Sequence, residues 1–212
     1  QAQAGELDEA VTYLQSLRAN NPDQAEKLWL LEVNLLIDQD KKPQALIAAN
    51  AALAEFPRNI ETRYARAMLL DSEGQTDKAE QDLNTILEIQ PDSSVTLNAL
   101  GYILTERTNR LDEAQRHIEK ALTLDPENPA ILDSMGWVLF RQGKVMEALD
   151  YLSRAWAVYP DPEVAAHYGE ALWSIGEEEQ ARIIWQKGLE ADPDHDILTK
   201  TVERLTTTGS HE

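Results

Sequence analysis

Histidines and clustered carboxylates are the residues of this chain that could support catalysis or metal binding, because the sequence contains no cysteine. The four histidines, His117, His167, His195 and His211, lie far apart along the chain. Glu177, Glu178 and Glu179 are consecutive, so on a helix their side chains point in different directions and suit a solvated first turn. A catalytic site needs a nucleophile, a base and an orienting group held together. We therefore expect no enzyme activity, no metal site and no cofactor.

The charge of the chain restricts its partners. The formal net charge is −19, from 38 acidic and 19 basic residues. Nucleic acids and anionic lipids bind basic surfaces that release counterions, so we expect neither as a partner. No apolar run approaches the 18 residues or more of a membrane-spanning helix, so we expect no transmembrane segment in this chain. The acidic field either attracts cationic partners or only keeps the protein in solution.

A repeated sequence pattern predicts the helices on which any functional site would have to lie. An alanine is followed twelve residues later by a proline at Ala10/Pro22, Ala45/Pro57, Ala79/Pro91, Ala114/Pro126, Ala148/Pro160 and Ala181/Pro193. Successive alanines are 35, 34, 35, 34 and 33 residues apart. Such a period is typical of a helical solenoid, in which each unit is one helix pair that buries its apolar face against its neighbours.

Residues 130–160 show the unit most clearly. The apolar residues of its first helix are Leu132, Met135, Gly136 and Leu139, and those of its second helix are Ala148, Leu149, Leu152 and Ala155. These spacings place each set on one helix face. We expect Gly136 and Ala148 to lie where the two helices cross, since a larger side chain there would separate the backbones.

The turn inside each helix pair is predicted from the residue five positions before the repeated alanine. The residues at this position are Gly5, Asp40, Gly74, Asn109, Gly143 and Gly176. Glycine adopts the left-handed backbone that ends many helices, and asparagine and aspartate tolerate it.

These residues resemble the tetratricopeptide repeat family, whose pattern is W-x2-L-G-x2-Y, then A-x3-F, then P. The first part appears as L-x2-L-G-x2-L at 97–104 and L-x2-M-G-x2-L at 132–139. The resemblance implies an all-α fold, a right-handed superhelical solenoid of antiparallel helix pairs. The second full repeat departs from the pattern, with Arg63 and Arg66 where apolar residues are expected, and the first has Glu32 or Val33 at the small position.

We expect one continuous array over residues 1–205. It comprises a half repeat at 6–20, repeats at 23–57, 58–91, 92–126, 127–160 and 161–193, and a capping helix at 194–205. Ile197, Leu198, Val202 and Leu205 would cover the last pair. Residues 206–212 form a tail, in which 209–212 are as compatible with the remnant of a purification tag as with a native end. Because the chain starts at Gln1 and with half a repeat, we expect it to be a piece of a longer or processed protein.

The family resemblance also implies a binding surface, because four positions of each first helix face the inner, concave wall. The predicted groove residues are Tyr64, Met68, Asn98, Tyr102, Asp133, Trp137, Phe140, Glu170 and Trp173. We expect the aromatic residues to be exposed and to anchor a peptide. The alternative is that they pack between adjacent repeats. Acidic residues stand where chaperone-binding members carry basic ones, and only Asn98 matches, so a carboxylate clamp is not expected.

The sequence thus predicts a non-enzymatic scaffold or adaptor for a protein or peptide. The run from residue 98 to 160 resembles bacterial outer-membrane lipoproteins of this repeat family that partner a periplasmic carboxyl-terminal processing protease. That resemblance implies an adaptor that delivers substrates to the protease at the periplasmic face of the outer membrane, through a lipid anchor upstream of this chain. Otherwise we expect a cytoplasmic protein. An assembly factor for an envelope machine, such as a pilus or a polysaccharide exporter, remains an alternative, as does an enzyme if a metal or cofactor copurifies.

Overall fold

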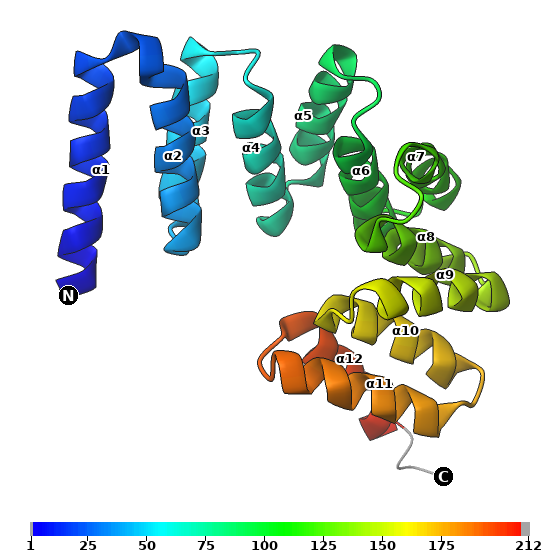
Figure 1. The fold of residues 1–212 in the computed structure, drawn as a ribbon. Helices are drawn as coiled ribbons and strands as arrows, with labels where there is room; N and C mark the ends of the chain where they lie inside the picture. The colour runs from blue at the N-terminus through cyan, green and yellow to red at the C-terminus, as the bar shows by residue number, and fades with distance from the viewer. Residues whose placement is uncertain (1, 209–212) are drawn as a thin grey trace. The chain divides into compact units, whose positions relative to one another are not determined.

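The computed structural model describes the backbone of residues 2–208 and the side chains of residues 6–207. Residues 209–212, which include His211 and most of the expected tail, lie outside it. In the described backbone the regular elements are twelve α-helices and one short 3-10 helix (Figure 1). They are α1 (Ala2–Asn20), η1 (Pro22–Gln24), α2 (Ala25–Asp38), α3 (Lys42–Glu55), α4 (Ile60–Ser72), α5 (Thr76–Ile89), α6 (Ser94–Arg107), α7 (Leu111–Leu124), α8 (Pro129–Arg141), α9 (Val145–Val158), α10 (Pro162–Ser174), α11 (Glu178–Ala191) and α12 (Asp196–Thr208).

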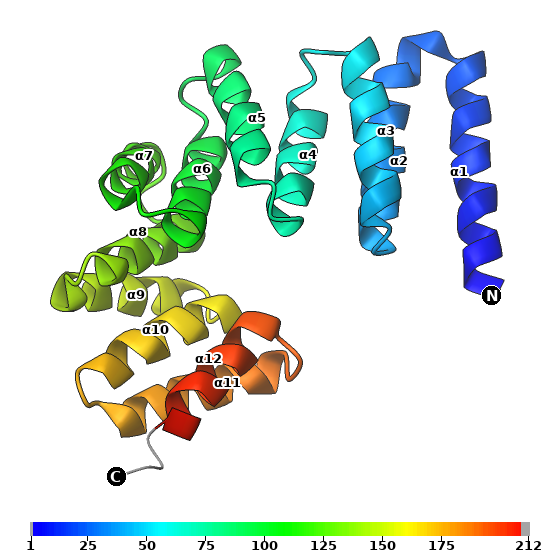
Figure 2. The ribbon, with the colours of Figure 1, turned by 180° about the vertical axis from the view of Figure 1, so that it is seen from behind.

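The chain divides into two compact units. Unit 1 covers Gln1–Pro91 and unit 2 covers Asp92–Glu212. Unit 1 contains the pairs α2/α3 and α4/α5, and unit 2 contains α6/α7, α8/α9 and α10/α11 followed by α12. Within each pair the two helices run antiparallel, as Figures 1 and 2 show from opposite sides. The all-α fold of stacked helix pairs confirms the predicted fold class.

The repeated prolines mark where the helices end. Each second helix from α3 to α11 stops two residues before its proline, for example α7 at Leu124 before Pro126. A capping residue then starts the next first helix: Asn59, Ser93, Asn128 and Asp161 each accept a hydrogen bond from a backbone N–H of the following turn. Proline cannot continue the helix before it, and the capping side chains accept from the free N–H groups of the helix that follows. The ends of these helices are therefore determined by local sequence.

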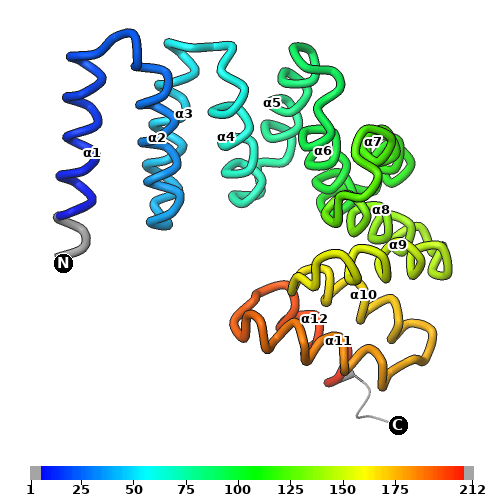
Figure 3. The backbone as a smooth tube through the Cα atoms, viewed as in Figure 1, coloured from blue at the N-terminus to red at the C-terminus, as the bar shows by residue number. Residues whose placement is uncertain are grey.

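Four of the six predicted left-handed turns are confirmed. The backbone φ is +52° at Asp40, +71° at Gly74, +81° at Gly143 and +85° at Gly176. Gly5 instead lies inside α1. Asn109 is not among the described residues with positive φ, because Thr108 is extended and its hydroxyl accepts a hydrogen bond from the Arg110 N–H at 3.0 Å. This hydroxyl turn replaces the left-handed residue. Figure 3 shows the path of the backbone through the turns that join the helices.

Glycine is required where the helices of unit 2 cross. A Cβ on Gly136 would lie 2.5 Å from Leu152 Cγ, and one on Gly101 would lie 2.4 Å from Ile118 Cγ1. On Gly169 it would lie 2.0 Å from Trp185 Nε1. Real side chains do not approach this closely, so the predicted role of Gly136 in the crossing is confirmed.

The last helix differs from its predicted bounds. α12 begins at Asp196 and continues to Thr208, so residues 206–208, which we assigned to the tail, are helical. In this extra turn the Thr206 side chain is half-buried, and its hydroxyl donates to the Val202 carbonyl at 2.7 Å. Leu198 is fully buried against the preceding pair, whereas Ile197 is 39% exposed and does not cover it.

Candidate protein-binding face

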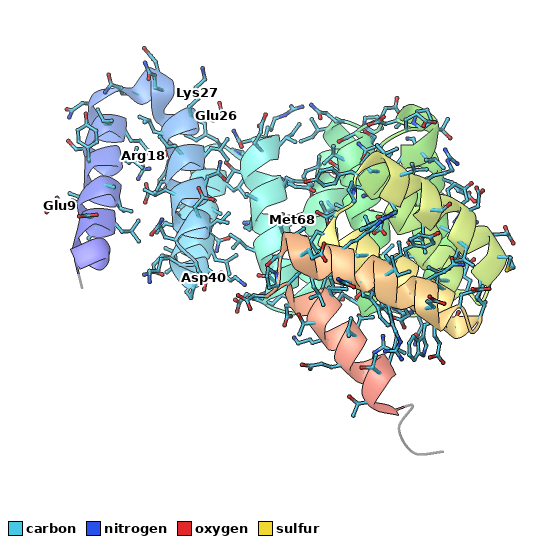
Figure 4. The ribbon with its side chains drawn as sticks, turned by 60° about the horizontal axis from the view of Figure 1, so that its bottom comes forward. Glu9, Arg18, Glu26, Lys27, Asp40 and Met68 are labelled. Atoms are coloured by element: carbon cyan, nitrogen blue, oxygen red, sulfur yellow. The ribbon has the colours of Figure 1, made fainter. Side chains whose placement is uncertain are left out.

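The first helices of unit 2 lie next to one another and carry most of the predicted groove residues. α6 contacts α8, α8 contacts α10 and α10 contacts α12. We call the side chains along α6, α8, α10 and α12 the first-helix face of unit 2. The predicted groove residues on these helices are Asn98, Tyr102, Asp133, Trp137, Phe140, Glu170 and Trp173. Tyr64 and Met68 lie on α4 in unit 1, and Figure 4 labels Met68.

Four side chains of the first-helix face form a packed group, which we call the His167 cluster: Tyr102, Asp133, Trp137 and His167. The imidazole of His167 stacks on the Trp137 indole, with ring centroids 4.1 Å apart and planes at 14°. His167 Nδ1 lies 2.8 Å from Asp133 Oδ2. The Tyr102 ring completes the group, with its centroid 6.3 Å from that of His167. The cluster therefore joins α6, α8 and α10.

The predicted exposure of Trp137 is wrong. Its side chain is 8% exposed and Asp133 is 5% exposed. His167 from the next repeat covers the Trp137 ring, and Glu106 from the previous repeat accepts its N–H at 2.5 Å. For Trp137 the alternative of packing between repeats applies.

The carboxylates of this face connect neighbouring helices. Glu106 accepts from Trp137 and lies 3.4 Å from Arg141 Nη1, both on α8. Glu170 on α10 accepts from Arg204 on α12 at 2.6 Å. The Tyr102 hydroxyl donates to Glu163, which links α6 directly to α10. These three carboxylates thus help to fix the spacing of the repeats.

The electrostatics of the cluster follow from burial beside carboxylates. Burial alone would lower the pKa of His167, but Asp133, with Glu163 and Glu106, raises it above its ordinary value. Burial and the same three carboxylates raise the pKa of Tyr102 far above its ordinary value, so the phenol keeps its proton. Asp133 Oδ1 is buried and has no hydrogen-bond partner among the described residues. The neighbouring carboxylates therefore favour the protonated form of the imidazole.

Other predicted groove residues remain partly accessible around the cluster. Phe140 is half-buried and stacks on Trp137, with ring centroids 5.2 Å apart. Trp173 is half-buried, lies 5.4 Å from Trp185 and is covered on one side by the Arg182 guanidinium at 4.8 Å. Asn98 and Glu170 are also half-buried, as are Tyr64 and Met68 in unit 1, where burial raises the pKa of Tyr64.

Sequence reasoning missed two members of this network, His167 and Glu106. His167 lies 34 residues after Asp133, about one repeat length, which was the available signal that the two could meet in adjacent repeats. Within the described part of the chain no group of three histidine or acidic residues is arranged to hold a metal ion. None of the described helices has the length and hydropathy to cross a bilayer.

Comparison with known proteins agrees with the helix pairs. Two models of the tetratricopeptide repeat match residues 30–94 and 107–167, and between them cover more than half of the chain. The chain belongs to the tetratricopeptide repeat family.

A curated relative and two solved structures give this assignment more detail. The chain is 43% identical over 203 residues to the "TPR repeat-containing protein PA4667" of Pseudomonas aeruginosa, a match that covers 96% of this chain and 34% of the relative. The chain thus spans about a third of that relative. A Thermus thermophilus TPR protein superposes with a TM-score of 0.74 at 21% identity, covering 85% of this chain and 99% of that one. The type IV pilus biogenesis factor PilW superposes with a TM-score of 0.70 at 20% identity, covering 89% of this chain and 96% of that one. At these identities the structures share the fold.

Proposed function

We propose that this chain is a non-enzymatic scaffold that binds a protein or peptide on the first-helix face of unit 2. Phe140 and Trp173 supply the aromatic contacts, Asn98 and Glu170 supply polar ones, and the His167 cluster is the rigid base beneath them. In unit 1, considered by itself, Tyr64 and Met68 on the first helix α4 are proposed as binding residues. Protein binding is the general role of the tetratricopeptide repeat fold.

The observation that carries this proposal is the stacking of Phe140 on buried Trp137. A half-buried ring held by a fixed neighbour is already ordered before a partner arrives, so binding loses little side-chain entropy. Large aromatic side chains in such positions dominate many protein interfaces. Glu106 and Glu170 already accept hydrogen bonds from Trp137 and Arg204. A partner that covers these carboxylates therefore does not leave them without a donor.

For the partner, we propose a periplasmic carboxyl-terminal processing protease together with its substrates. The support is the resemblance of residues 98–160 to outer-membrane lipoproteins of this repeat family that act as adaptors. The proposal includes attachment to the periplasmic face of the outer membrane through a lipid anchor. The rival function is assembly of a type IV pilus, which the fold shared with PilW favours.

Site-specific photo-crosslinking in bacterial cells tests both the proposed binding face and the identity of the partner. A photoreactive phenylalanine analogue replaces Phe140, and in a matched control it replaces Met146, which is 71% exposed on the second helix α9. We expect a crosslinked protein from position 140 and none from position 146. Mass spectrometry of the crosslinked band then separates a protease or its substrates from pilus components. Crosslinking from position 146 alone would place the binding surface on the second helices instead.

A further inference from the structure

Helix α4 carries two arginines where the repeat pattern expects apolar residues, and both reach one buried carboxylate on α5. Arg66 binds Asp82 through Nε and Nη2, each at 2.7 Å, and Arg63 Nη1 lies 3.0 Å from the same carboxylate. The Asp82 side chain is 5% exposed. Arg63 also donates to the Pro57 carbonyl at 2.5 Å. Asp82 therefore fixes the positions of both guanidinium groups.

The two arginines line a cavity of about 300 Å³ between α3 and α5. The polar residues that line this cavity include Asn50, Arg63, Arg66, Gln75, Lys78 and Asp82. Residues 1–91 contain 16 acidic and eight basic residues, yet the cavity is lined by three of these basic residues and by Asp82 alone among the acidic ones. It is an electropositive pocket in an acidic unit, and that charge is complementary to an anion.

Two cationic donors at this pocket are bonded to neutral acceptors. Arg66 Nη1 donates to Asn50 Oδ1 at 2.8 Å, and Lys78 Nζ donates to Gln75 Oε1, also at 2.8 Å. Both bonds are solvent-exposed. A carboxylate oxygen forms a stronger hydrogen bond with a cation than an amide oxygen does. The amide oxygens of Asn50 and Gln75 thus mark places that an incoming anion can take.

We propose that this pocket of unit 1 binds a carboxylate of a partner polypeptide, either an aspartate or glutamate side chain or a chain end. The carboxylate accepts from Arg66 Nη1 and Lys78 Nζ and displaces the two amide oxygens, while Asp82 holds the arginines in place. Three basic side chains and one carboxylate leave the pocket with a formal surplus of two positive charges, which attracts a carboxylate in spite of Asp82. The site lies in unit 1 and does not depend on the function proposed for unit 2.

The test is an NMR titration of the full chain with sodium acetate at constant ionic strength. Acetamide, which has the shape of acetate without its charge, is the matched probe. We expect acetate to shift the side-chain signals of Arg66, Asn50 and Gln75, and acetamide to leave them unchanged. Lys78→Ala should weaken acetate binding about tenfold, because it removes one charge-assisted bond. Asn50→Ala should bind acetate at least as well as the unaltered chain, because a competing acceptor is gone.

Lys27→Ala is the control variant, since it removes the same charge from the exposed start of α2 (Figure 4), and Lys27 does not line the pocket. It should leave acetate binding unchanged. Because Lys78 and Asn50 are exposed, their variants keep the fold, which the backbone amide spectrum verifies. Three results would overturn the proposal: equal shifts with acetamide, equal weakening by Lys27→Ala, or binding of inorganic phosphate without any response to acetate.

Discussion

Units 1 and 2 build the same helix pairs with different chemistry at the helix crossings. In unit 2, Gly101, Gly136 and Gly169 let the first helices approach apolar side chains of the second. In unit 1 the inside of α4 carries the Arg63/Arg66–Asp82 group next to the small, buried Ala67. The difference shows that one repeat geometry tolerates both an apolar crossing and a charged one.

A second buried ion pair of unit 1 joins α1 to α2. Arg18 on α1 faces α2, where its guanidinium lies 2.6 Å from Glu32 and 3.2 Å above the Trp29 ring centroid, whereas Glu9 projects from the opposite side of α1 (Figure 4). Glu32 is 4% exposed, and its neighbour Val33, the other residue considered for the small position, is fully buried. Buried ion pairs fail when one partner is lost, and close-packed glycines fail when volume is added. The two units should therefore respond to different substitutions.

The largest effect is expected for Asp82→Ala. This change leaves two largely buried arginines without their carboxylate, which should lower the free energy of unfolding of unit 1 by about 3–5 kcal/mol. Hydrogen exchange read by mass spectrometry reports each unit separately, so protection should fall in α3–α5 and persist in α8–α10. Glu88→Ala, at an exposed position of the same helix, is the control. A loss below about 1 kcal/mol would mean that the charged crossing stabilises little.

A triple replacement sharpens the same comparison. Arg63→Leu, Arg66→Met and Asp82→Leu together convert the crossing of unit 1 to the apolar kind found in unit 2. Such replacements of buried ionic groups are often neutral or stabilising. We expect the triple variant to recover most of the stability that Asp82→Ala loses, measured as the urea midpoint. No recovery would show that the charges are needed for the geometry of the pair.

Trp137→Ala should be nearly as damaging, but in unit 2. Removing a buried indole that contacts both neighbouring first helices, α6 and α10, should cost about 3 kcal/mol or more. Phe140→Ala, at a half-buried position stacked on the same ring, should cost less than half of that. Denaturant dependence of exchange in α6–α10 checks both variants. Equal losses for the two would mean that Trp137 is no more deeply packed than its neighbour.

Gly136→Leu should destabilise unit 2 by about 1–3 kcal/mol, because the new side chain overlaps Leu152 on α9. Thermal melting followed by circular dichroism measures the change. Met146→Leu, on the exposed side of α9, serves as the control and should be close to neutral. An unchanged melting temperature for Gly136→Leu would show that α8 and α9 can separate without loss.

The smallest effect is a pH dependence of unit 2. The pKa of His167 is higher in the folded unit than the ordinary value of about 6.5. The stabilisation from its protonated form is therefore complete below about pH 6.5 and is lost as the pH rises through the folded pKa, at up to about 1.4 kcal/mol per pH unit. Urea midpoints of the unaltered chain should fall over this range. His167→Gln should flatten the fall, and His195→Gln should not. A rise of stability with pH would contradict the assignment.

The fold could be predicted because its signals are local. The spacing from Ala148 to Pro160 predicts one helix and the place where it ends. A glycine predicts a left-handed turn at its own position. The site could be predicted only in part. The repeat position of Trp137 gives its helix face, but its burial depends on His167 one repeat ahead and Glu106 one repeat behind. Likewise Arg63 and Arg66 stood out as anomalies, whereas their partner Asp82 did not.

The bond between Tyr102 and Glu163 has a consequence for how unit 2 folds. It joins residues 61 positions apart and passes from α6 to α10, beyond the adjacent pair. Repeat arrays behave as linear chains in which each unit is coupled to its nearest neighbours. In unit 2 the bond couples the pair α6/α7 to the pair α10/α11, which is its second neighbour. Opening of α8/α9 alone would therefore also break the bond between Tyr102 and Glu163. We expect three pairs to melt as one cooperative block, and this block should assemble only after its last member is synthesised.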